Sequence, residues 1–92
     1  MITREQAKQI VLISTKDDMK KNNKTLDDIC MMSPKIGRDS WTYREYIEAT
    51  ENDTDLDDCE GSNPIDMMLN YEKYLNEKGK SLLDTWKRRI NP

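Results

Sequence analysis

Three aspartates at alternate positions are the residues of this sequence whose spacing best matches a ligand site. Asp53, Asp55 and Asp57 fit positions 1, 3 and 5 of a calcium-binding EF-hand loop, where carboxylate oxygens coordinate the ion. The match then fails, because position 6 requires glycine and is Asp58, and position 12 requires a bidentate glutamate and is Pro64. We therefore expect no metal here, and a calcium-responsive helical protein is only the third function that we weigh.

The side chain that enzymes use most often for acid–base catalysis is missing from the chain. It contains no histidine, which is the commonest general base and metal ligand near neutral pH. Cys30 is expected to pack in the core, and Cys59 stands between two acidic residues that disfavour a reactive thiolate. The sequence therefore predicts a protein that is not an enzyme and that uses no cofactor.

Charged residues are strongly segregated along the chain. Residues 45–72 hold ten acidic side chains and no lysine or arginine, whereas the segments on either side are net positive, so a formal net charge of -3 conceals a strongly negative middle. Fields of this kind steer association with oppositely charged partners. We expect the acidic surface to consist of Glu48, Glu51, Asp53, Asp55, Asp57, Asp58 and Glu60.

A folded surface with this many carboxylates matches nucleic-acid backbone in charge. We expect it to bind a basic, nucleic-acid-handling protein such as a nuclease and to inhibit or mask it, as nucleic-acid mimics and immunity proteins do. Direct binding of nucleic acid is disfavoured, because phosphate contacts supply most of the affinity and carboxylates repel phosphates. The alternative function is a helix-turn-helix-like transcription-regulatory adaptor over residues 25–50, and the simpler interpretation is a solvated loop that aids solubility. Abundant Lys, Asn and Ile fit an AT-rich bacterial or phage gene.

A second candidate surface consists of Met67, Tyr71 and Tyr74, which lie at i, i+4 and i+7 of a predicted helix. Methionine and tyrosine are enriched at protein interfaces. This stripe predicts a homodimer or an apolar contact with the partner. The simpler alternative is a helix that is buried on both sides between two others.

Capping side chains mark the helix starts. Thr3 and Gln6 have the spacing of a capping box, and Asn63 before Pro64 is the clearest start in the chain. Gly79 can supply the left-handed residue that follows a helix. We expect helices after the start signals at Thr3, Thr25, Ser40 or Thr42, Asn63 and Ser81.

These elements predict an all-α fold, a compact bundle of four to five short helices with a long acidic loop before the helix that begins at Pro64. The length of 92 residues predicts a single domain, 1–92. No window approaches the roughly 18–20 apolar residues of a membrane span, and the first residues lack an export signal. We therefore expect a cytoplasmic protein with reduced cysteines and no membrane contact.

Overall fold

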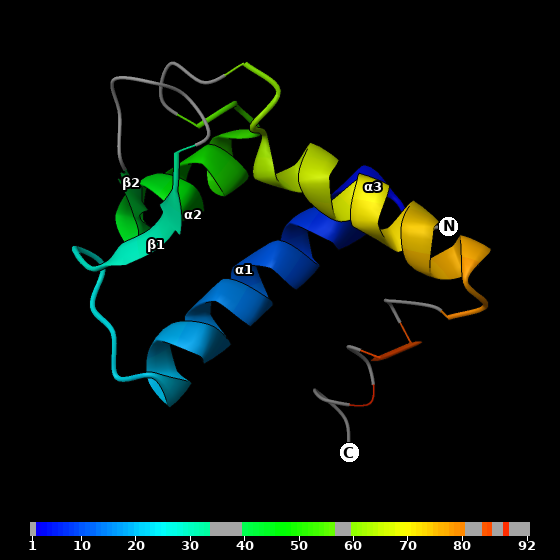
Figure 1. Ribbon diagram of the computed structural model, residues 1–92, viewed down its shortest axis with the longest axis horizontal. Helices are drawn as coiled ribbons and strands as arrows, with labels where there is room; N and C mark the ends of the chain where they lie inside the picture. Colours follow the sequence, from blue (N-terminus) through cyan, green and yellow to red (C-terminus); the bar gives the residue numbers. More distant parts are fainter. Residues whose placement is uncertain (1, 34–39, 57–59, 81–83, 86–87, 89–92) are drawn as a thin grey trace.

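Three helices and one pair of strands make up the described part of the chain. The computed structural model describes residues 2–33, 40–56, 60–80, 84–85 and 88. Along them run α1 (Arg4–Lys21), β1 (Ile29–Met32), β2 (Ser40–Thr42), α2 (Tyr43–Asn52) and α3 (Pro64–Glu77). α1 packs against both α2 and α3, and the two strands lie beside α2 (Figure 1). None of the helices in these ranges has the length and apolar character needed to cross a membrane.

The helix starts that the sequence predicts most clearly are confirmed. In a capping box, the Thr3 hydroxyl accepts the Gln6 N–H at 3.1 Å and the Gln6 side chain accepts the Thr3 N–H at 2.9 Å. Thr42 begins α2 with a second capping box. Asn63 Oδ1 accepts the first free N–H groups of α3, and Gly79 beyond its end has φ +79°. The helix predicted after Ser81 lies largely outside the described residues. The three residues of it that the structure describes, Asp84, Thr85 and Arg88, are helical.

The predicted all-α bundle of four to five helices is wrong, because residues 29–32 form a strand. The spacing of Thr25 and Asp28 predicts a helix start, but here the Asp28 carboxylate accepts the Thr25 N–H at 2.6 Å and closes a turn. β1 then pairs antiparallel with β2, with Ile29 opposite Thr42. The register shifts between Ile29 and Met31, so Cys30 is the additional residue of a β-bulge.

The same turn, followed by β1, replaces the first of the two helices expected for the helix-turn-helix alternative. The Tyr43 N–H donates to the Asp28 carbonyl at 3.0 Å, and the Arg44 N–H donates to the Leu26 carbonyl at 2.9 Å. The turn is therefore joined directly to the start of α2, where a helix-turn-helix motif would need a preceding helix. Between residues 25 and 50, α2 is the single helix that the described residues form.

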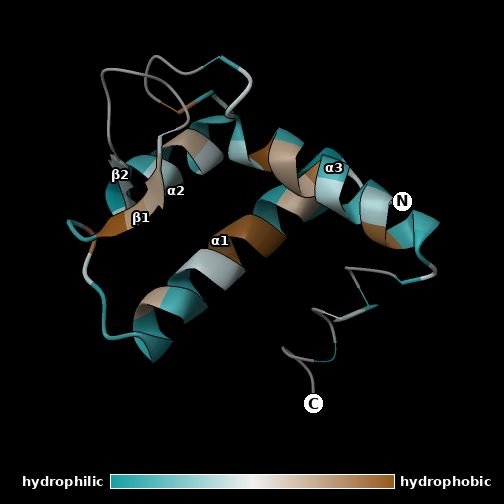
Figure 2. Ribbon diagram, in the orientation of Figure 1, coloured by the Kyte–Doolittle hydropathy of each residue, from teal (hydrophilic) through white to brown (hydrophobic). Residues whose placement is uncertain are grey.

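Two small clusters of buried side chains hold these elements together. The first lies where α3 crosses the apolar part of α1 (Figure 2). The second joins the strands, α2 and the acidic segment that follows α2, which it reaches at Leu56. Leu56 belongs to the second cluster and is 1% exposed, so the predicted acidic loop is anchored in the core. The first cluster contains Ile2, Ala7, Ile10 and Ile65, with Met68 and Leu69 against it; the second contains Trp41, Ala49 and Leu56, with Met31, Tyr46 and Met67 against it.

Candidate functional site

The carboxylates of α2 and the segment after it line a groove of about 300 Å³. Helical spacing puts Glu45, Glu48 and Asn52 on one face of α2. Thr54 and Asp55 complete the groove from the segment that follows the helix. Three of the lining side chains are therefore acidic, two from α2 and one from the segment after it. We call this site the α2 groove.

Backbone hydrogen bonds fold the acidic segment back against α2. Asp53 ends the helix in the left-handed conformation with φ +53°, and the Thr54 N–H donates to the Ala49 carbonyl at 2.9 Å. Further on, the Leu56 N–H donates to the Ser62 carbonyl at 3.2 Å. The Gly61 N–H donates to the Asp55 carboxylate at 3.2 Å. These bonds and the burial of Leu56 hold Asp55 at the groove.

Asp53 has a structural role that differs from the predicted one. Its carboxylate accepts two hydrogen bonds from the Arg4 guanidinium, one of them from Nε at 2.7 Å, and one from Asn63 Nδ2 at 2.9 Å. Arg4 Nη1 also donates to the Asp66 carboxylate at 2.5 Å. The Arg4 guanidinium, followed by Asn63, holds the pKa of Asp53 well below its usual range. Asp53 therefore links the start of α1 to the end of α2 and the start of α3, and its charge is offset by Arg4.

This arrangement also bears on the calcium spacing. Of the three aspartates at alternate positions, Asp53 is engaged by Arg4, and Asp57 lies outside the described residues, as do Asp58 and Cys59. Within the part of the chain that the structure describes, no group of three or more His, Cys, Asp or Glu side chains could hold a metal ion.

Glu48, Glu51 and Glu60 remain as exposed carboxylates. None of them forms a salt bridge with a described residue; the acidic residues that do so are Asp17, Asp27, Asp53 and Asp66. Their charge is therefore solvated and is not offset by a neighbouring cation within the described ranges. An approaching lysine or arginine side chain would meet carboxylates that pair with no cation in the described part of the chain.

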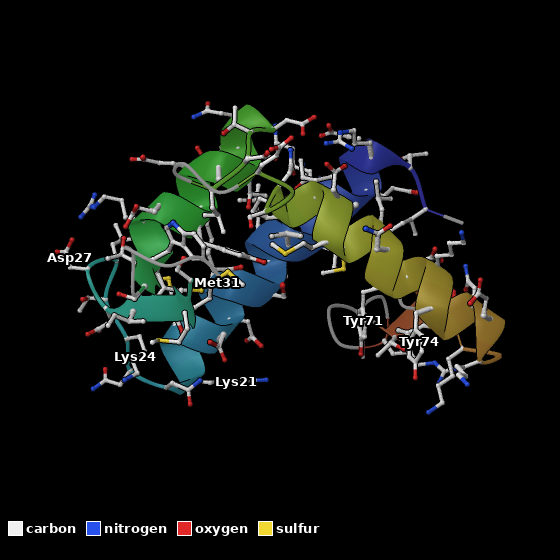
Figure 3. All side chains as sticks on the ribbon, turned by 45° about the horizontal axis from the view of Figure 1, so that its top comes forward. Lys21, Lys24, Asp27, Met31, Tyr71 and Tyr74 are labelled. Atoms are coloured by element: carbon white, nitrogen blue, oxygen red, sulfur yellow. The ribbon has the colours of Figure 1, made fainter. Side chains whose placement is uncertain are left out.

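The predicted apolar stripe is divided by the fold. Met67 is half-buried and packs against the cluster around Trp41. Tyr71 and Tyr74 are 51% and 54% exposed and lie together on α3, at the end of the molecule far from the strands (Figure 3). The Nζ atom of Lys78 lies 5.8 Å from the centre of the Tyr74 ring. The burial of α3 on both sides, the simpler alternative, is therefore not what the described residues form.

Glu72 is the last of the ten acidic residues between positions 45 and 72, and its burial was not predicted from the sequence. It is 2% exposed, on the face of α3 that also carries Ile65 and Leu69. Its Oε1 accepts a hydrogen bond from Asn76 Nδ2 at 2.5 Å, and Oε2 has no hydrogen-bond partner among the described residues. The available signal was its spacing, since position 72 follows Leu69 by three residues and continues the buried stripe.

Similarity to known proteins adds nothing to this geometry. Comparisons of the chain with protein-family models, with curated proteins and with solved structures found no match.

Proposed function

We propose that this chain is a non-enzymatic protein of the cytoplasm that binds a basic protein through the α2 groove, and that it inhibits or masks a partner that handles nucleic acid. The observation that supports the proposal is a group of exposed carboxylates on α2 and the segment after it that have no described cationic partner: Glu48, which lines the groove, and Glu51 and Glu60 outside its lining. Carboxylates that no described cation offsets attract an oppositely charged surface and accelerate its association.

The size and polarity of the groove suit a basic side chain. A groove of about 300 Å³ is at the lower limit of typical ligand pockets. Its lining combines the carboxylates of Glu45, Glu48 and Asp55 with the side chains of Asn52 and Thr54, which can accept hydrogen bonds. A lysine or arginine inserted from the partner would find several oxygen acceptors around its charged head.

The test is capture of the partner from lysate of the native host at low salt, followed by elution with a salt gradient. The expected result is a basic, nucleic-acid-handling protein that elutes at moderate salt and that is released by competing DNA. Glu48→Lys should abolish the capture, because it reverses one charge in the groove. The matched control Glu77→Lys makes the same change at an exposed position at the end of α3, outside the groove, and should retain it. Capture of neutral or acidic proteins only, or an affinity that does not depend on salt, would count against the proposal.

The exposed pair Tyr71 and Tyr74 favours a second contact, either with the partner or with another copy of the chain. Tyrosine supplies a large rigid face with a polar tip, and two such rings are more than half exposed on one helix. The double change to serine should abolish self-association in analytical ultracentrifugation and leave the melting temperature of the monomer unchanged. If the double variant loses its fold instead, the rings contribute to the core and do not form an interface.

A further inference from the structure

A second cavity, of about 390 Å³, lies between the end of α1, the β-bulge and the start of α2. It shares no lining residue with the α2 groove, and Tyr43 and Tyr46 reach it from the other side of α2. The bulge matters here because it places Cys30 in the lining. The cavity is lined by Ser14, Thr15, Asp17, Asp18, Lys21, Cys30, Tyr43 and Tyr46.

The carboxylate of Asp18 is held in a fixed position at this cavity. Its Oδ2 accepts the Tyr43 hydroxyl at 2.7 Å, and its Oδ1 accepts the Asn22 side-chain N–H at 2.8 Å. The neighbouring Asp17 is paired with Lys21 at 3.0 Å. Asp18 forms no ion pair with a described residue, so the lining keeps one negative charge that its own lysine does not offset.

The remaining polar groups of the lining stay neutral. The hydrogen bond to Asp18, followed by desolvation, raises the pKa of Tyr43 to about 12. Burial, with a smaller effect of the Asp18 charge, raises the pKa of Cys30 to about 11. A thiol and a phenol that hold their protons leave Asp18 as the group that decides the sign of the local potential.

Aromatic rings next to a fixed carboxylate are the combination that recognises organic cations. The rings of Tyr43 and Tyr46 line the cavity from one helix, and the faces of aromatic rings attract ammonium groups at distances up to about 6 Å. The volume lies within the range of small-molecule sites. The hydroxyl of Ser14 donates to the Val11 carbonyl at 3.1 Å, which leaves its oxygen free to accept a hydrogen bond.

From this geometry we infer that the cavity binds an alkylammonium group, with Asp18 as its ion-pair partner and the rings of Tyr43 and Tyr46 against its charged head and alkyl chain. Such a group occurs on free alkyl amines and at the end of a lysine side chain. The inference does not depend on the function proposed for the α2 groove, because the two sites have no residue in common.

The experiment uses the full chain with 1,5-diaminopentane as the probe, pentane-1,5-diol as its neutral equivalent, and Nα-acetyl-lysine amide to represent a lysine side chain. Amide chemical shifts measured by NMR during the titrations give both affinity and location. We expect saturable binding of the amine, with the largest shifts at Thr15, Cys30 and Tyr46, and no saturable binding of the diol. Tighter binding of the diamine indicates a free amine as the ligand, and tighter binding of the lysine derivative indicates a protein side chain.

Asp18→Asn should weaken binding of the diamine about tenfold or more, because the ion pair is lost. Asp27→Asn is the matched control, since it removes the same charge at a side chain that is 82% exposed and outside the cavity lining. It should leave the affinity within about twofold, because the charge of so exposed a side chain is largely screened by water and salt. Equal weakening by both variants, saturation by the diol, or shifts that map away from the cavity would overturn the inference. Mapping on the wild-type chain decides the question even if Asp18→Asn does not fold.

Discussion

Truncation of Leu56 tests whether the acidic segment is anchored as the structure describes. Leu56 is 1% exposed and packs with Trp41 and Ala49, although acidic residues surround it in the sequence. Leu56→Ala removes about three carbons from water-excluded surroundings, worth about 0.8 kcal/mol each. A cavity adds to this loss, and measured costs of such changes run from about 2 to 5 kcal/mol. The segment lies at the surface and can partly collapse, so we expect about 2–3 kcal/mol.

This loss is large for a chain of 92 residues, whose total stability is expected to be about 5–14 kcal/mol. At about 4–8 °C per kcal/mol for a domain of this size, the melting temperature should fall by about 10–20 °C. Urea unfolding followed by circular dichroism at 222 nm measures the free energy, and a thermal scan measures the shift in melting temperature. Both reports come from the helices, so the signal does not depend on the tryptophans.

Leu26→Ala provides the matched control, because it makes the same change at a side chain that is 37% exposed in the turn before β1. We expect it to cost about 1 kcal/mol, as a partly exposed side chain loses less buried area. The reasoning is refuted if Leu56→Ala costs no more than Leu26→Ala. In that case residues 53–56 would not be fixed against the core, and Asp55 would not be held at the α2 groove.

Two further predictions concern carboxylates with a structural role, the ion-paired Asp53 and the buried Glu72. Because the Arg4 guanidinium lowers the pKa of Asp53 in the folded state, this carboxylate stabilises the fold fully above about pH 5, and the contribution is lost as the pH falls below the ordinary value of about 3.9. Asp53→Asn should therefore lower the melting temperature at pH 7. Between pH 5 and pH 2 the melting temperature of the variant should fall by less than that of the wild type; an equal fall in both proteins would contradict the role of the Arg4–Asp53 pair. Glu72→Met should raise the melting temperature, because an apolar side chain of similar volume replaces a buried oxygen without a described partner. A fall would show that the carboxylate contributes a favourable interaction.

The parts of the fold that the sequence predicts correctly depend on contacts over three or four residues. The capping box at Thr3 and the cap at Asn63 each join a side chain to a backbone N–H within the same turn of helix, and so does the cap at Thr42, one of the two starts that the sequence left open. Such contacts can be inferred from spacing alone. Gly79 after α3 belongs to the same class, since its positive φ ends the helix locally.

The strand pair was missed because its evidence is not local. Thr25 and Asp28 have the same spacing in a helix cap and in the turn that they form here, so the spacing does not distinguish the two. The strand is decided by the pairing of Ile29 with Thr42, which comes after residues 34–39 in the sequence. Apolar runs as short as residues 29–32 fit either a strand or a helix segment.

The acidic character of the candidate site follows from the sequence, but the residues that line it do not. The absence of lysine and arginine between residues 45 and 72 draws attention to α2 and the segment after it, where the groove lies. It cannot show that Arg4, 49 positions away from Asp53, engages two of the acids. Nor does any spacing indicate that Asp18 meets the hydroxyl of Tyr43, 25 positions along the chain. Contacts of this kind follow from how α1 packs against its neighbours.

The ten acidic residues between positions 45 and 72 therefore do not form one uniform negative surface. Asp53 and Asp66 share the guanidinium of Arg4, and Glu72 is buried on α3, so these three contribute little to an approaching partner. The carboxylates that remain solvated and without a described cation are concentrated along α2 and the segment after it. A field from fewer, closer charges favours a small basic contact over a long basic channel, because the attraction between exposed charges is screened beyond about 8–10 Å. This geometry predicts that charge reversal at Glu48 has a larger effect on partner binding than neutralising Asp53 or Asp66.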